Sequence, residues 1–124
     1  MIDDSDGPVT HIDIGRYVKA RKEHRCNECR RTIRAGERYH NETFLDDNRN
    51  IKNHKTCPHC MVARGWLWDE CGGWLYGGVR EDVLDHWIDK GDIRLARLIV
   101  GMRRKWTTRR GALMPMPEMP GVTP

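Results

Sequence analysis

The chain has 124 residues, of which 38% are hydrophobic and 32% are charged, and its formal net charge is +4. This length suffices for one domain with tails, and the low apolar share predicts a small core. No apolar run approaches the roughly 20 residues of a membrane span, and the acidic N-terminus lacks the apolar segment of a signal peptide, so we expect a cytoplasmic protein with reduced thiols and no membrane contact.

The first predicted elements are a leader, a tight turn and two strands. Residues 1–16 are acidic and then contain Gly7-Pro8, which predicts a flexible leader. Cys26 and Cys29 are spaced to form a turn that points both sulfurs the same way. Alternating residues predict a strand from Glu37 to Leu45, the cluster at 46–50 predicts a turn, and residues 51–54 predict a short returning strand.

Three helices are expected next. Pro58 fits a first helical position, which predicts a helix that starts at Cys57 and stops at Gly72-Gly73. The second is expected over 80–90, with an apolar stripe of Val83, Leu84, Trp87 and Ile88. The third is expected to be capped by Asp92, with a stripe of Leu95, Leu98, Ile99, Met102 and Trp106. The Pro- and Met-rich residues 111–124 are expected to form a disordered tail.

Two Cys-x-x-Cys pairs carry the clearest chemical signal. Cys26, Cys29, Cys57 and Cys60 can supply the four thiolates of a tetrahedral Zn²⁺ site. His54 lies close enough before Cys57 to replace Cys60, which would then be a small buried residue on the helix. Either set closes the shell, so we expect one structural zinc ion. Cys71 stands alone and is expected to be a small buried residue.

A resemblance adds to this pattern. The residues Cys26-x-x-Cys29, Ile33-x-x-Gly36-Glu37-x-Tyr39 and His54-x-x-Cys57 resemble the treble-clef zinc fingers, similar to LIM and PARP-type patterns. This implies a small α+β zinc-binding fold: a treble-clef-like knuckle, β-hairpin and helix over about 22–72, then two C-terminal helices over about 79–108. Together they would form a single zinc-stabilised domain over 17–110.

The resemblance also bears on function. The chain is similar to small zinc-finger proteins of tailed phages, which implies a regulator or inhibitor that acts on host machinery or nucleic acid. Treble clefs also host HNH nucleases, and His40 with Asn48 or Asn50 could fill two of their catalytic positions. The helix after Cys60 offers no metal-binding His, so we expect no enzyme, no catalytic residues and no small-molecule substrate.

The basic residues leave two interpretations open, a solvated face and a surface that contacts phosphate. Their concentration favours a module that binds nucleic acid or a nucleic-acid-processing protein. The alternative is a pure protein-interaction inhibitor or adaptor, because five Trp exceed what a small core holds and Trp68 is a candidate anchor. The candidate contact residues are Arg21, Lys22, Arg25, Arg30, Arg31, Arg103, Arg104, Lys105 and Trp68.

Overall fold

The computed structural model describes residues 15–45 and 48–119, which form an α+β structure of antiparallel strands and three helices. The strands are β1 (Arg16–Lys19), β2 (His24–Arg25), β3 (Thr32–Ile33), β4 (Arg38–Leu45) and β5 (Ile51–Thr56). The helices are α1 (Pro58–Cys71), α2 (Val79–Lys90) and α3 (Ile93–Arg103). In this part of the chain, no helix has the length and apolar character that crossing a membrane requires.

The main sheet has the strand order β1-β4-β5, and both pairings are antiparallel. The predicted hairpin is confirmed, although β5 runs two residues beyond the expected 51–54. β1 was not predicted as a strand, and it begins at Arg16, inside the predicted leader. The rest of that leader, residues 1–14, and part of the predicted turn, residues 46–47, lie outside the described residues.

A second, two-stranded sheet pairs β2 with β3 and carries the first cysteine pair in its connecting turn. The backbone closes this turn twice, since the Arg30 N–H donates to Cys26 O at 3.0 Å and the Cys26 N–H donates to Arg31 O at 2.9 Å. Asn27 then joins the turn to β5: its N–H donates to Lys55 O, and its side-chain oxygen accepts from the Lys55 N–H, both at 2.8 Å. The first cysteine pair is thereby held beside the strand that leads to the second.

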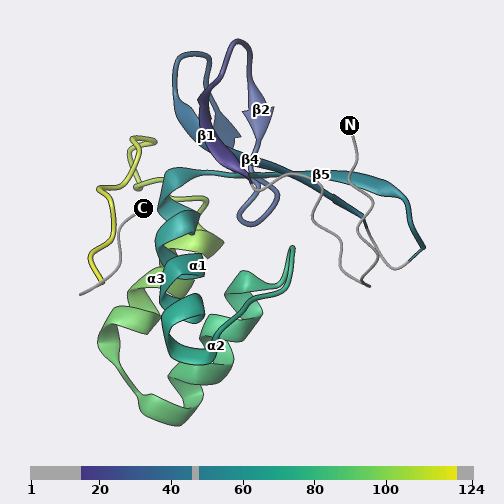
Figure 1. Cartoon of the computed structure of the whole chain (residues 1–124). Helices are drawn as coiled ribbons and strands as arrows, with labels where there is room; N and C mark the ends of the chain where they lie inside the picture. Colours follow the sequence, from purple (N-terminus) through teal and green to yellow (C-terminus); the bar gives the residue numbers. More distant parts are fainter. Residues whose placement is uncertain (1–14, 46–47, 120–124) are drawn as a thin grey trace.

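Helix α1 begins and ends where the sequence predicts. Cys57 is the N-cap residue, and Pro58 occupies the first turn, where its missing N–H costs no hydrogen bond. Gly72 ends the helix in a left-handed conformation (φ 77°), and its N–H donates to Trp68 O at 2.9 Å. In Figure 1, α1 descends from the end of β5; below the sheets, α2 packs against α1, and α3 packs against α2.

A buried ion pair joins α1 to the hairpin. Arg64 of α1 donates from Nη1 to Glu42 Oε2 of β4 at 2.8 Å and to Thr56 Oγ1 at 3.2 Å. The Tyr76 hydroxyl donates to the other carboxylate oxygen of Glu42 at 3.0 Å, and the Arg64 guanidinium lies 3.5 Å from the centre of the Trp74 ring. Helix, hairpin and the loop after α1 are therefore fixed to one another by a shared charge pair.

The predicted apolar stripe of α2 is wrong for three of its four residues. Val79 and Val83 are buried against α1 and α3, but Leu84, Trp87 and Ile88 are exposed, Ile88 by 70%. The physical reason is angular: at about 100° per residue, Ile88 lies roughly opposite Val79 on the helix. The neighbouring helices cover only one side of α2, so most of its predicted stripe faces solvent.

The predicted stripe of α3 is buried except for Ile99, which is partly buried, and its last member is placed by a turn after the helix. Leu95, Leu98 and Met102 are buried within the helix, which Asp92 caps by accepting from the Arg94 N–H at 2.9 Å. Trp106 follows the end of the helix, and its backbone N–H donates to Gly101 O at 2.7 Å. The chain thus folds back and lays the Trp106 ring over Gly101.

The C-terminal segment differs from the predicted disordered tail over residues 111–119. Leu113 bridges to Thr107, the Met114 N–H donates to Trp106 O at 2.7 Å, and Met119 is only 4% exposed. The prolines do prevent regular secondary structure, but they leave methionine side chains available to pack. Residues 120–124 lie outside the described residues.

The contact between Gly101 and Trp106 generates a stability prediction. A Cβ at Gly101 would lie 2.2 Å from Trp106 Cζ3, so Gly101→Ala must displace the ring. We expect this variant to lower the free energy of unfolding by about 1–3 kcal/mol, although Ala normally stabilises a helix by about 1 kcal/mol over Gly. Urea unfolding measures the change. Gly73→Ala, which meets no atom within 4 Å, is the control, and equal stability of the two variants would contradict the packing argument.

The buried ion pair generates a pH prediction. Burial raises the pKa of Glu42, but the nearby His40 imidazole, the charge and hydrogen bond of Arg64 and the hydrogen bond from Tyr76 outweigh it and lower this pKa to about 2, from 4.5. Because the pKa of Glu42 is lower in the folded than in the unfolded protein, the ionised carboxylate stabilises the fold at pH values above the unfolded pKa of about 4.5. Its contribution to the free energy of unfolding is roughly 3 kcal/mol at pH 7, and it is lost as the pH falls from about 4.5 to about 2.

We therefore expect the wild type to lose about 0.8 kcal/mol of its stability advantage over Glu42→Gln between pH 7 and pH 4. Urea unfolding of both proteins at each pH measures this difference, and any zinc release common to both cancels. Glu81→Gln, at an exposed position, is the matched control. Parallel stability profiles of wild type and Glu42→Gln would contradict the assigned interaction.

Candidate metal centre

Four buried cysteines from two parts of the chain meet at one point. Cys26 and Cys29 come from the turn between β2 and β3, Cys57 caps α1, and Cys60 lies in its first turn. Their sulfur atoms all lie within 4.8 Å of one another, and none of the four residues is more than 6% exposed. This cluster could hold a metal ion.

The donor set fits zinc. A tetrahedral ion with Zn–S bonds of about 2.3 Å requires sulfur atoms about 3.8 Å apart. The sulfur atoms of Cys29 and Cys57 are 3.9 Å apart. Four thiolates around one ion form a closed shell, in which Zn²⁺ has a structural role and no position for water.

Three N–H groups point at the sulfur atoms. Cys26 Sγ accepts from the backbone N–H of Glu28 at 3.4 Å and from that of Cys57 at 3.3 Å. Cys60 Sγ accepts from the indole N–H of Trp106 at 3.3 Å. Such donors offset the negative charge of thiolates and orient them toward a metal. The Trp106 bond also attaches the segment after α3 to the centre.

The four thiols influence one another's ionisation. Hydrogen bonds from neighbouring thiols, above all that of Cys29, lower the pKa of Cys26, whereas burial raises the pKa of Cys60. A divalent ion bound among the four sulfurs would favour loss of the remaining thiol protons, because its charge offsets that of the thiolates.

His54, the alternative ligand, is directed elsewhere. Its Nε2 lies 2.8 Å from Glu28 Oε2, and its ring meets Tyr76 edge-on. The same Glu28 carboxylate accepts the backbone N–H groups of Gly77 and Val79 at 2.8 and 3.2 Å. Glu28 therefore connects the first cysteine pair to the start of α2. This role of Glu28 was not predicted, because the sequence indicates it only by the presence of an acidic residue between Cys26 and Cys29.

Cys71 is placed differently from the prediction. It is exposed rather than buried, because α1 ends there beyond the part that the other elements cover. Its Sγ lies 3.4 Å from His86 Nε2, and His86 Nδ1 lies 2.9 Å from Asp82 O. Cys71 is thus remote from the four-cysteine cluster and is partnered by α2.

Residues weighed for nuclease chemistry lie on the hairpin. His40 is on β4, where its Nδ1 lies 3.6 Å from Glu42 Oε2 and its ring meets Tyr17 edge-on. Asn48 and Asn50 are exposed in the turn between β4 and β5. His40 is therefore part of the interactions around the buried Glu42 carboxylate.

The predicted contact residues are exposed with one exception. Arg31 is only 7% exposed: its Nη1 donates to Thr32 O at 3.0 Å and to Glu37 Oε1 at 3.1 Å. Burial opposes its charge, but the Cys57 sulfur and the Glu37 carboxylate outweigh burial and raise the pKa of Arg31. Arg31 thus acts beside the metal centre instead of forming an open contact surface. The exposed members are Arg21, Lys22, Arg25, Arg30, Arg103, Arg104, Lys105 and Trp68.

The structure brings part of the two basic runs together. Arg25, Arg30 and Arg31 line one pocket with Lys105, whereas Arg21 and Lys22 line a separate depression beside Tyr39. Trp68 is 62% exposed near the end of α1, while Trp66 packs against the core and meets the His86 ring edge-on.

Neither a scan against protein-family models nor searches of curated proteins and of solved structures found a match for this chain.

The geometry of the cluster generates a metal prediction. We expect purified protein to contain one zinc ion per chain, and a chelator to abolish its near-UV circular dichroism and unfold it, because a structural metal supplies folding free energy. Elemental analysis and circular dichroism measure the two effects. Stripped protein that keeps its melting temperature would contradict the structural role.

Variants distinguish the two candidate ligand sets. Cys60→Ser should weaken zinc binding by more than tenfold in a competition titration with a zinc-sensitive dye, because it removes a thiolate from the cluster. His54→Gln, which retains a donor toward Glu28, should keep one tightly bound ion. Cys71→Ser is the control for loss of a thiol outside the cluster, and the opposite ranking of Cys60→Ser and His54→Gln would assign His54 as the ligand.

Proposed function

We propose that this chain is a non-catalytic zinc-binding module of the treble-clef type that binds nucleic acid through its basic surface. The four-cysteine cluster supports the metal-binding part of the proposal. The observation that carries the binding part is the exposure of basic side chains around that cluster, for which the described part of the chain supplies no carboxylate at ion-pair distance.

The order of elements supports the treble-clef assignment. One cysteine pair lies in the turn between β2 and β3, the β4–β5 hairpin follows, and the second pair occupies the start of α1. This is the knuckle, hairpin and helix order of the resemblance found in the sequence. The helices α2 and α3 extend the module below the strands, where α2 packs against α1 and α3 against α2 (Figure 1).

The chemistry of the cluster supports a structural ion rather than a catalytic one. Catalytic zinc keeps one position open for water or substrate, which the ion then polarises. Four thiolates leave no such position. The ion would instead hold two parts of the chain together and present their surface.

The charge distribution supports nucleic acid as the partner. Arg25, Arg30 and Lys105 are exposed, and within residues 15–45 and 48–119 no carboxylate lies at ion-pair distance from them. Unneutralised Lys and Arg side chains on one surface attract phosphates and release counterions on binding. A phage regulator of host nucleic-acid machinery is compatible with this chemistry.

A protein-interaction role is the second candidate, and the exposed apolar residues favour it. Trp68 is 62% exposed, and Leu84, Trp87 and Ile88 on α2 also face solvent. Exposed Trp side chains often anchor protein interfaces. This surface lies on the helices, whereas the basic residues at the cluster flank the cysteine turn, so the two candidates can be tested separately.

The test is a binding titration of zinc-loaded protein with labelled DNA and RNA across salt concentrations. We expect binding at low salt that weakens as salt rises, with a slope of about 0.9 per neutralised phosphate on duplex DNA. Trp68→Ala should bind as the wild type does, since it leaves the basic surface intact. No detectable binding at low salt would remove direct nucleic-acid contact and leave the Trp68 surface as the basis of function.

A further inference from the structure

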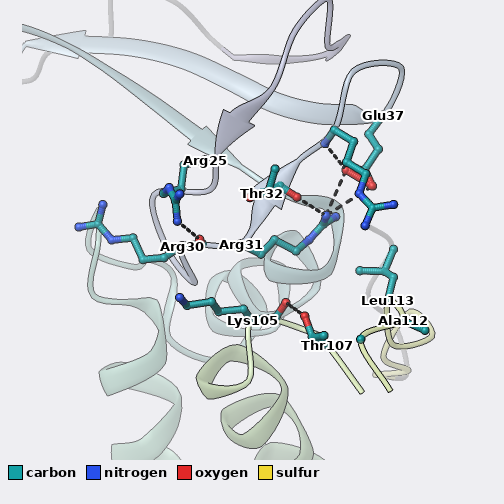
Figure 2. A pocket seen from close by; sticks show the side chains of 11 residues that line it. Arg25, Arg30, Arg31, Thr32, Glu37, Lys105, Thr107, Ala112 and Leu113 are labelled. Atoms are coloured by element: carbon teal, nitrogen blue, oxygen red, sulfur yellow. Dashed lines mark hydrogen bonds and ion pairs between the residues drawn. The ribbon is translucent and has the colours of Figure 1, made fainter. Parts of the chain in front are cut away.

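A basic pocket of about 570 Å³ lies between the first cysteine turn and the segment that follows α3 (Figure 2). Its walls come from parts of the sequence that are far apart: the residues around Cys26–Cys29 on one side, and the residues after Arg103 on the other. Glu37 is the one acidic residue among those that line it. The basic residues that line it are Arg25, Arg30, Arg31, Arg34 and Lys105.

The single acid in this pocket is already neutralised. Arg31 Nη1 lies 3.1 and 3.4 Å from the two carboxylate oxygens of Glu37, and the Arg34 N–H donates to the same carboxylate at 2.9 Å. Figure 2 shows this pair at one end of the pocket, while the nitrogen atoms of Arg25, Arg30 and Lys105 lie toward the other end. Among the described residues, the lining of the pocket therefore carries a net positive charge, which attracts an anion.

Two of the basic residues adopt a backbone conformation that favours glycine. Arg30 has φ 72° and Lys105 has φ 55°, both in the left-handed region. A non-glycine residue is strained there, and such strain is found disproportionately at functional sites. Arg30 and Lys105 belong to different walls of one pocket, so both walls carry a charged residue where glycine would suit the backbone better.

The metal centre positions both walls. Arg30 directly follows Cys29, and its N–H closes the turn by donating to Cys26 O. Lys105 directly precedes Trp106, whose indole donates to Cys60 Sγ. Each wall therefore contains a basic residue that is adjacent in sequence to a member or a contact of the cysteine cluster.

We propose that this pocket is the subsite that binds backbone phosphates of the nucleic acid, and the proposal rests on the function proposed above. Guanidinium groups match phosphate oxygens with paired N–H donors, and Lys adds a point charge. Its volume of about 570 Å³ exceeds that of a phosphate group, and basic residues line both of its walls. The pocket would thus be one defined phosphate-binding position within the basic surface.

The test compares three substitutions to glycine, each of which removes one positive charge from a left-handed position. Arg30→Gly and Lys105→Gly change the pocket, and Arg49→Gly is the matched control. Arg49 has φ 65° but lies in the turn between β4 and β5, outside the pocket. All three should fold, with melting temperatures equal to or above that of the wild type, because glycine relieves strain at these positions.

Binding of a labelled DNA duplex by the zinc-loaded full chain is then measured across salt concentrations. Arg30→Gly and Lys105→Gly should each weaken binding about fivefold or more and lower the salt slope by about 0.9. Arg49→Gly should change affinity by less than about twofold. If Arg30→Gly loses zinc, Arg25→Gln, at a strand position, replaces it as the second pocket variant.

The possible failures are distinct. Wild-type protein that binds no nucleic acid overturns both the proposed function and this subsite. Wild-type protein that binds, with the pocket variants no weaker than Arg49→Gly, overturns the subsite alone and leaves the function on the remaining basic surface. A loss of affinity confined to the two pocket variants, with unchanged melting temperature and zinc content, supports the subsite.

Discussion

The four converging cysteines are the constraint on which the rest of this structure depends. They connect three segments: the β2–β3 turn, the start of α1 and, through the Trp106 indole, the chain after α3. A chain with 38% hydrophobic residues has little apolar surface to hold such segments in place. An ion bound in the cluster would supply the missing free energy at the point where they meet, because the ligands converge only in the folded chain.

Two buried carboxylates add further links between the sheets and the helices that the cysteine cluster joins. Glu28 lies inside the first cysteine pair and accepts from His54 and from the start of α2, while Glu42 accepts from Arg64 of α1 and from Tyr76. Each carboxylate has several donors, as a buried charge requires. The two carboxylates link the sheets to the helices by directed bonds, which explains how so few apolar residues can specify one arrangement of three helices.

Local signals in the sequence predicted the parts of the fold that local physics decides. Pro58 and Gly72 mark the two ends of α1, Asp92 caps α3, and the spacing of the cysteines indicates their convergence. These features depend on backbone geometry and on residues only a few positions apart. They could therefore be recognised without knowledge of the tertiary structure.

The missed features depend on distant partners. The sequence predicts Arg31 as one more exposed cation, whereas the folded chain places it between Glu37 and the cysteine cluster. Met119 follows two prolines and reads as part of a disordered tail, yet it is buried. Ile88 fits an apolar stripe, but no element covers that side of α2. In each case the burial of the residue is decided by a segment far away in sequence.

The same dependence on distant partners links the proposed binding site to the metal. Arg30 directly follows Cys29, and Lys105 directly precedes Trp106, whose indole N–H donates to Cys60 Sγ. Cys29 and Trp106 are also members of the buried core, so the core and the cysteine cluster together position the two basic residues. If zinc binding and the proposed phosphate binding favour the same arrangement, thermodynamic linkage requires each to strengthen the other. A structural ion would then influence binding without touching the nucleic acid.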